Sequence, residues 1–171
     1  MGVSSQARDY RVALIVLSDK AASGLRSDEC LPAMRASLPA CCTVVSETVL
    51  ADDAKALESM LTRLADGDAV DGIFTSGGTG LGSRDLTPQA TRAVADYEVP
   101  GIGEAMRART ANAVPQAILS RAIAAVRKRT LIVNLPGSPK AVRETLAVIS
   151  PILGHAFDVL RGNVGEHAAS G

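Results

Sequence analysis

The sequence predicts an α/β fold with a mostly parallel β-sheet and one antiparallel strand. Near-continuous β-branched and aliphatic runs, such as residues 11–18 (RVALIVLS), are typical of strands covered on both faces. Such runs alternate with segments whose apolar residues recur at helical spacing, which is the pattern of βαβ units. The chain has 171 residues, 47% of them hydrophobic, so we expect one domain over residues 11–161. We expect flexible ends at residues 1–10 and 162–171.

The first half of the chain shows three strand–helix units in succession. One of the helical segments has Leu57 and Leu61 on one apolar stripe and ends before Gly67. Another is expected to have Thr87 as its N-cap and Pro88 at its first helical position. The strands are predicted at 11–18, 43–50 and 70–76, and the helices at 28–38, 53–65 and 88–96.

The second half is less regular, because prolines and glycines interrupt residues 99–120, where we expect an irregular layer. Two apolar runs around the cationic corner at residues 127–129 are interpreted as a hairpin that adds the antiparallel strand. The elements expected here are helical pieces at 104–111 and 116–121, strands at 122–126 and 130–135, and helices at 140–149 and 151–160.

Composition and charge exclude several classes of function. The 18 basic and 18 acidic residues cancel, so no net field draws the protein to nucleic acid or to an anionic membrane. Two Phe, two Tyr and no Trp leave few rings for stacking on bases. No apolar run approaches the roughly 20 residues that cross a bilayer, and the polar N-terminus lacks the pattern of a signal peptide. We expect a cytoplasmic protein without nucleic-acid or membrane partners, whose cysteines, Cys30, Cys41 and Cys42, are free thiols.

The segment after the third predicted strand is rich in glycine. Residues 76–82 read SGGTGLG, with four glycines in seven positions. Glycines allow backbone N–H groups to approach an anion, and the amino end of the following helix is also electropositive. The lysine of a P-loop is absent, and a tight turn would also explain a glycine cluster. We expect a phosphate-binding loop formed by Ser76, Gly77, Gly78, Thr79 and Gly80.

Aspartates follow two of the predicted strands at the same edge of the sheet. Asp52 and Asp53 come after the second strand, and Asp85 lies in the glycine-rich segment after the third. Proteins usually hold Mg²⁺ with one or two carboxylates together with substrate oxygens, so these side chains are candidates for metal-assisted phosphoryl or nucleotidyl transfer. The alternative is that each aspartate only caps the helix that follows it.

Two further strand ends point to the same edge. Ser18 and Asp19 follow the first strand, where a solvated turn is the alternative interpretation. The last strand leads into a turn stiffened by prolines, in which the Ser138 hydroxyl and backbone donors are presented, unless it is a plain strand-to-helix turn. The candidate binding residues at this last strand end are Asn134, Pro136, Gly137 and Ser138.

Five stretches of the chain form a recognisable set: LSDKAASG at 17–24, TSGGTGLGSRDLTPQAT at 75–91, VPGIGEAMR at 99–107, AILSRA at 117–122 and NLPGSPKAV at 134–142. Taken together, these stretches resemble the MogA/MoaB family of molybdenum-cofactor proteins over most of the chain, from residue 12 to about residue 160. The first stretch is more similar to the MogA branch, the molybdopterin adenylyltransferases. The resemblance implies a three-layer α/β/α homotrimer that transfers AMP from Mg-ATP to the terminal phosphate of molybdopterin, releases pyrophosphate, and passes the product to a MoeA-type protein.

The resemblance also assigns roles by matching position. The glycine loop at residues 77–80 would bind substrate phosphate, and Asp52 and Asp85 would be the catalytic carboxylates that hold Mg²⁺. Glu104 and Ser138 would lie in the molybdopterin-binding region. Ala51 stands where the family often has proline, which leaves open whether Asp52 or its neighbour is the functional acid.

Three other functions are compatible with parts of this pattern. A non-catalytic molybdopterin carrier of the same fold would bind the pterin without releasing pyrophosphate. A MoeA-type molybdotransferase is expected to be much longer than this chain. A generic phosphate-binding α/β domain explains the glycine loop but not the co-occurring stretches at 17–24 and 134–142.

Overall fold

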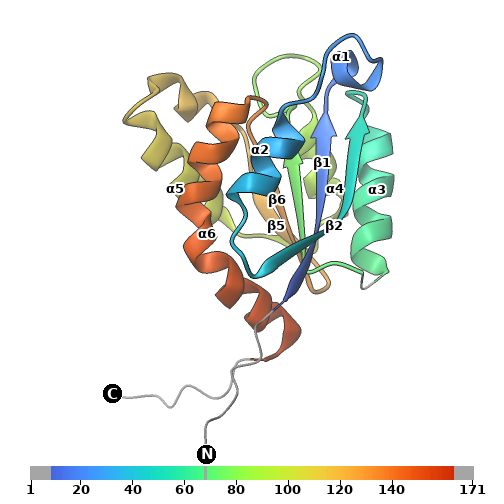
Figure 1. Cartoon of the computed structure of the whole chain (residues 1–171), viewed down its shortest axis with the longest axis vertical. Helices are drawn as coiled ribbons and strands as arrows, with labels where there is room; N and C mark the ends of the chain where they lie inside the picture. Colours follow the sequence, from blue (N-terminus) through green and yellow to red (C-terminus); the bar gives the residue numbers. More distant parts are fainter. Residues whose placement is uncertain (1–8, 68, 164–171) are drawn as a thin grey trace, which may run out of the picture.

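The computed structural model describes residues 9–67 and 69–163, which surround a six-stranded sheet in the order β2-β1-β3-β6-β5-β4 (Figure 1). β1 pairs in parallel with β2 and β3, and β3 pairs in parallel with β6. β5 runs antiparallel to both of its neighbours, as the predicted hairpin requires. The strands are β1 (Tyr10–Leu17), β2 (Cys42–Leu50), β3 (Gly72–Ser76), β4 (Tyr97–Glu98), β5 (Ala124–Arg127) and β6 (Thr130–Leu135).

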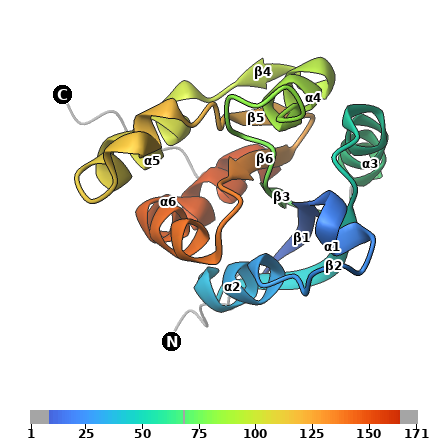
Figure 2. The same ribbon diagram turned by 90° about the horizontal axis from the view of Figure 1, so that it is seen from above.

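Helices cover both faces of this sheet, which confirms the three-layer α/β/α arrangement (Figure 2). α2, α5 and α6 pack on one face, and α3 and α4 pack on the other. The helices are α1 (Asp19–Ala22), α2 (Cys30–Ser37), α3 (Ala54–Asp66), α4 (Thr87–Val94), α5 (Pro100–Ala111), the 3-10 helix η1 (Pro115–Leu119) and α6 (Pro139–Arg161). Within the described residues, no helix is both long and apolar enough to cross a membrane.

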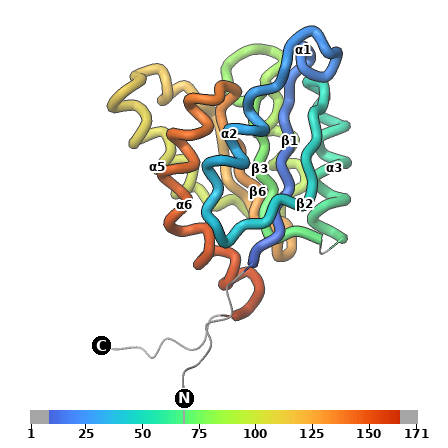
Figure 3. Tube along the Cα trace, viewed as in Figure 1, coloured from blue at the N-terminus to red at the C-terminus, as the bar shows by residue number. Residues whose placement is uncertain are grey.

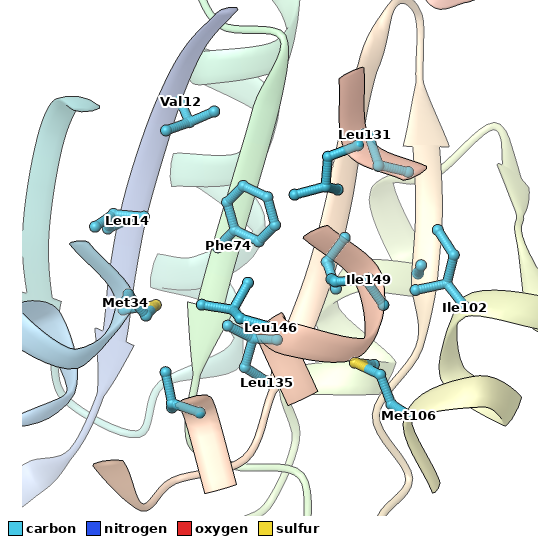
Figure 4. Packing of buried hydrophobic residues seen from close by; sticks show 14 of the residues in the cluster. Val12, Leu14, Met34, Phe74, Ile102, Met106, Leu131, Leu135, Leu146 and Ile149 are labelled. Atoms are coloured by element: carbon cyan, nitrogen blue, oxygen red, sulfur yellow. The ribbon is translucent and has the colours of Figure 1, made fainter. Parts of the chain in front are cut away.

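Alternation along β1 shows how the sheet divides the core in two. Val12 and Leu14 belong to the cluster beneath α2 and α6, whereas Ala13 and Ile15 belong to the cluster beneath α3 and α4. All four side chains are fully buried, because helices cover both faces of a parallel sheet. In Figure 4 the larger cluster fills the space between the strands and α6, with Phe74 at its centre.

The carboxyl ends of β1, β2, β3 and β6 lie at one edge of the sheet, because these four strands run parallel. In Figure 3 the chain after β1 (blue) and the chain after β3 (green) emerge at this same edge. The candidate residues at the strand ends are therefore brought to one side of the molecule, as the sequence predicts.

Several predicted elements differ from the structure. The two final helices predicted at 140–149 and 151–160 are one continuous helix, α6, with Pro151 inside it. Proline removes one backbone hydrogen bond, but buried residues on both sides of it, among them Leu146 and Leu153, keep the helix on the sheet. Thr87 is not the N-cap of α4; Leu86 occupies that position, and the Thr87 hydroxyl donates to the carbonyl of Gly77 at 2.8 Å.

Short elements and boundaries differ as well. α1 was expected to be a turn and β4 was not predicted, because four-residue and two-residue elements leave no periodic pattern. α5 begins at Pro100, earlier than expected, since proline fits the first turn of a helix. β1 begins at Tyr10, whose hydroxyl donates to Asp158 at 2.8 Å. Residues 1–8 and 164–171 of the expected flexible ends lie outside the described residues.

Replacing a core residue of α6 should show that this helix is held by packing. We expect Leu146→Ala to lower the free energy of unfolding by about 2–5 kcal/mol, because the Leu146 side chain is fully buried (Figure 4). Ile152→Ala on the same helix removes a side chain that is 44% exposed, and it should change stability by less than about 1 kcal/mol. Urea denaturation measures both values, and equal losses would contradict the packing described here.

Candidate functional site

The glycine loop leaves the sheet between the ends of two neighbouring strands. Gly77 and Gly78 follow β3 with φ angles of +102° and +66°, a region that L-residues with side chains rarely adopt. A Cβ on Gly77 would lie 2.4 Å from the backbone oxygen of Leu17 at the end of β1. The hydroxyl of Ser76 donates to the carbonyl of Pro136 at 2.7 Å, which ties the loop to the end of β6. The loop is therefore fixed against both neighbouring strand ends.

Four successive amides of this loop are available to a ligand. The N–H groups of Gly78, Thr79, Gly80 and Leu81 donate to no acceptor within residues 9–67 and 69–163. Backbone donors without an intramolecular acceptor bind anions well, particularly beside residues in left-handed conformations. The phosphate-binding role of residues 76–80 stays a prediction, and within this loop the buried Ser76 side chain is already engaged in a hydrogen bond.

The two adjacent aspartates after β2 have different partners. The Asp53 carboxylate accepts from the amides of Lys55 and Ala56 and caps α3. Asp52 instead pairs with Asp19: the amide of Asp19 donates to Asp52 Oδ2 at 3.3 Å, and the amide of Asp52 donates to Asp19 Oδ1 at 2.9 Å. The capping interpretation therefore holds for Asp53 and not for Asp52.

Asp19 also connects this pair to the glycine loop. Its second carboxylate oxygen lies 2.5 Å from a guanidinium nitrogen of Arg84. Asp85, the next residue, accepts the amide of Gly82 at 2.8 Å through Oδ2. The strand ends of β1, β2 and β3 are thus linked by charged and polar side chains.

Among the described residues, no three His, Cys, Asp or Glu side chains form a preformed metal site. Within the described residues, the carboxylates of Asp52 and Asp85 each accept one hydrogen bond, through Oδ2. The remaining oxygen of each carboxylate is a hard donor of the type that Mg²⁺ prefers alongside substrate phosphates. These two residues therefore fit a metal ion whose coordination is completed by oxygens of the substrate.

A cavity of about 510 Å³ opens beside the glycine loop. Its walls come from α5, η1, the loop itself and the start of α6, and they are mostly apolar. Glu144 is the carboxylate in this lining, and Arg107 is the cation. The lining residues are Thr79, Gly80, Leu81, Gly103, Met106, Arg107, Thr110, Val114, Gln116, Ala117, Leu119, Ser120, Ala122, Pro136, Ala141, Glu144 and Thr145.

Most of these lining residues were not predicted from the sequence. Many of them lie within the family-like stretches, among them Met106, Arg107 and Ala117, but those stretches did not indicate which of their side chains face a cavity. The predicted Glu104 lies on the exposed side of α5 and does not line the cavity. Glu104 lies about one helical turn before Arg107, whose side chain lines the cavity.

The predicted residues after β6 have structural partners. Asn134 is fully buried, and its amide nitrogen donates to the hydroxyls of Thr75 and Thr91 at 3.0 and 2.9 Å. Its side chain therefore does not reach the surface of the site, contrary to the expected binding role, because threonine hydroxyls and the amide of Ile123 satisfy its polar atoms inside the core. Ser138 is exposed and caps α6 through the amide of Ala141. Pro136 lines the large cavity.

A smaller cavity of about 80 Å³ lies between the ends of β1, β3 and β6. Ser18, which also caps α1, and Gly137 line it together with Cys30. Burial raises the pKa of the Cys30 thiol above its ordinary value, so the thiol stays protonated near neutral pH. All three cysteines are free, as predicted.

Comparison with known proteins assigns the family. Residues 13–155 match the family described as a probable molybdopterin binding domain, which covers most of the chain. The chain belongs to the MogA/MoaB family. This membership places the protein in molybdenum-cofactor biosynthesis and confirms the family resemblance of the strand-end stretches.

Individual relatives of this MogA/MoaB-family chain agree with the match. The molybdopterin adenylyltransferase of Escherichia coli K12 is 43% identical over 139 residues, which are 80% of this chain and 71% of that protein. The enzyme of the same name from Haemophilus influenzae is 41% identical over 139 residues, which again are 80% of this chain and 71% of that protein. MoaB from Thermus thermophilus, a molybdopterin biosynthesis enzyme, superposes with a TM-score of 0.85 and 43% identity, covering 90% of this chain and 97% of that one.

Replacing Gly77 should disrupt the site through the backbone alone. Gly77→Ala adds a Cβ 2.4 Å from the Leu17 oxygen at a positive φ, so we expect a loss of more than about 2 kcal/mol of unfolding free energy. Gly101→Ala in α5 is the matched control, since a Cβ there meets no atom within 4 Å. Thermal and urea unfolding measure the difference, and a Gly77→Ala protein as stable as the control would refute the close approach.

Proposed function

We propose that this protein is a molybdopterin adenylyltransferase, which transfers AMP from ATP to the terminal phosphate of molybdopterin and releases pyrophosphate. The observation that supports this most directly is the glycine loop: three of the residues whose amides have no acceptor among the described residues, Thr79, Gly80 and Leu81, line the 510 Å³ cavity. An anion site next to a mostly apolar cavity suits a substrate that has both a ring system and a phosphate. Relatives at 41–43% identity bear this enzyme name.

The cavity offers chemistry that matches the pterin part of such a substrate. Apolar side chains, among them Met106 and Leu119, provide surfaces against which a flat ring can pack. A pterin edge presents N–H donors, and the Glu144 carboxylate is an acceptor in the same lining. The phosphate end of the ligand would then point to the amides of Thr79 and Gly80, which border the cavity.

The reaction needs positioning more than an enzyme nucleophile. An oxygen of the molybdopterin phosphate forms a bond to the α-phosphorus of ATP, the bond from that phosphorus to the bridging oxygen breaks, and pyrophosphate leaves. The loop amides would hold the reacting phosphates in line, and water exclusion by the cavity walls would protect them from hydrolysis.

Mg²⁺ fits the same arrangement as a partner of the ATP phosphates. Asp52 and Asp85 would hold it, each through the carboxylate oxygen that accepts no hydrogen bond from the described residues. Bound there, the metal would neutralise phosphate charge. The homotrimer, the cytoplasmic location and the transfer of product to a MoeA-type protein remain predictions from the family.

The second candidate is a molybdopterin carrier of the same fold, because the description of the matched family, a probable molybdopterin binding domain, names binding and no reaction. Incubation of the protein with molybdopterin and Mg-ATP separates the two functions. An adenylyltransferase forms adenylylated molybdopterin and an equal amount of pyrophosphate. A folded sample that binds molybdopterin but forms neither product would reject the enzyme and support the carrier.

Substitution of single aspartates should separate their roles. We expect Asp85→Asn and Asp52→Asn to lower kcat/KM for adenylyl transfer by about 100-fold or more, because each removes a charge that faces the phosphates. Asp53→Asn is the matched control, since asparagine caps helices as well as aspartate does. Steady-state release of pyrophosphate measures all three, with unfolding temperatures to confirm the folded state. Full activity of Asp52→Asn together with loss in Asp53→Asn would reverse the assignment.

A further inference from the structure

The side chain of one arginine donates hydrogen bonds to two backbone carbonyls, one in the glycine loop and one shortly after it. Arg121 Nε donates to the carbonyl of Gly80 at 2.7 Å, and an Nη of the same guanidinium donates to the carbonyl of Asp85. The backbone amide of Arg121 donates to the carbonyl of Thr79 at 2.9 Å. Residues 81–84, between the two side-chain contacts, are exposed. The guanidinium therefore closes the base of an exposed turn.

These contacts orient the donors of the loop. In a planar trans peptide, the carbonyl and the following N–H point in opposite directions. Because the carbonyls of Thr79 and Gly80 face Arg121, the amides of Gly80 and Leu81 point away from it. Both amides belong to the set of four that have no acceptor within the described residues. The backbone of Arg121 thus sets the direction of the Gly80 amide, and its side chain sets the direction of the Leu81 amide.

The segment that contains Arg121 is itself held from the cavity wall. Arg107 Nη1 donates to the carbonyl of Ala122 at 2.7 Å and to that of Ser120 at 3.3 Å, one residue on each side of Arg121. A Cβ on Gly103 would lie 2.9 Å from the Ala122 oxygen, so a glycine permits this approach of α5. The wall of the cavity is therefore connected to the loop through two arginines.

Within the described residues, Arg121 and Arg107 both bond backbone carbonyls without a carboxylate partner, unlike two other arginines of the fold. Arg127 and Arg161 pair with the carboxylates of Asp66 and Asp71. In the part of the chain that the structure describes, the side chain of Arg121 bonds carbonyls only. Its charge is left uncompensated by a carboxylate beside the loop that would receive anionic phosphates, and a guanidinium can bridge two acceptors where an ammonium bonds as a point charge.

We propose that Arg121 is a positioning residue for adenylyl transfer, which holds Gly80 and Asp85 at a fixed separation so that the loop amides and the Asp85 side chain face the substrate together. This role rests on the proposed function. It requires no contact between Arg121 and the substrate. The proposal predicts that the rate of adenylyl transfer depends on the bridge between the two carbonyls as well as on the positive charge of Arg121.

The test compares Arg121→Gln and Arg121→Lys with Arg127→Gln. Arg127 is the matched control, because its guanidinium also makes several bonds, to Asp66 and to the carbonyl of Val94, at the opposite end of the sheet. We expect Arg121→Gln to lower kcat by about 10- to 100-fold, which is the cost of misplacing groups by about 1 Å. Arg121→Lys keeps the charge, so KM for ATP should stay within about threefold while kcat remains about tenfold low. Arg127→Gln should keep the wild-type kcat and KM.

Three results would overturn the proposal: wild-type kcat in Arg121→Gln, full kcat in Arg121→Lys, or an equal loss of kcat in Arg127→Gln. A second measurement separates this proposal from the proposed function. If the wild-type protein transfers no AMP, calorimetric titration with inorganic pyrophosphate still decides the matter. Weaker pyrophosphate binding in Arg121→Gln than in the wild-type and Arg127→Gln proteins supports the positioning role, and equal or undetectable binding in all three refutes it.

Discussion

The close packing of Gly77 against the end of β1 is the constraint on which the site depends. A side chain at this position would collide with the Leu17 oxygen, and a Cβ on Gly137 would lie 3.3 Å from the Gly77 Cα. The chain segments after β1, β3 and β6 therefore meet around one residue without a side chain. This contact determines where the loop turns and which amides it leaves without an acceptor. The same contact also determines the position of the adjoining cavity, because Thr79 and Gly80, which follow Gly77 in the loop, form part of the cavity wall.

The layers of the fold could be predicted from the sequence because they follow from periodicity. The long apolar run of β1 and the amphipathic stripe of α3 are patterns of neighbouring residues. Such patterns predict a strand or a helix without knowledge of the tertiary structure. The continuity of α6 through Pro151 could not be predicted, since it depends on packing against a sheet formed by distant residues. The cavity is similar: Arg107 and Glu144 come from separate helices, and only their tertiary arrangement places them in one lining.

The aspartates show where local reasoning reaches its limit. Asp52 and Asp53 are chemically identical neighbours, and in sequence each could cap α3. In the structure, Asp53 accepts hydrogen bonds from amides of α3, whereas Asp52 exchanges hydrogen bonds with Asp19. Motif reasoning correctly located the strand end, but only the fold distinguishes the structural carboxylate from the candidate functional one. Ser138 and Asn134 illustrate the same limit, because both have hydrogen-bond partners within the protein.

The buried amide of Asn134 has a consequence for how the sheet assembles. Its nitrogen reaches Thr75 on the neighbouring strand and Thr91 on α4 at the same time. A shift of one strand by a single residue would move the amide to the other face and leave polar groups unpaired in the core, at a cost of about 1–3 kcal/mol for each group. The hydrogen bonds of Asn134 therefore favour the one alignment of β3 and β6 that brings their loops together.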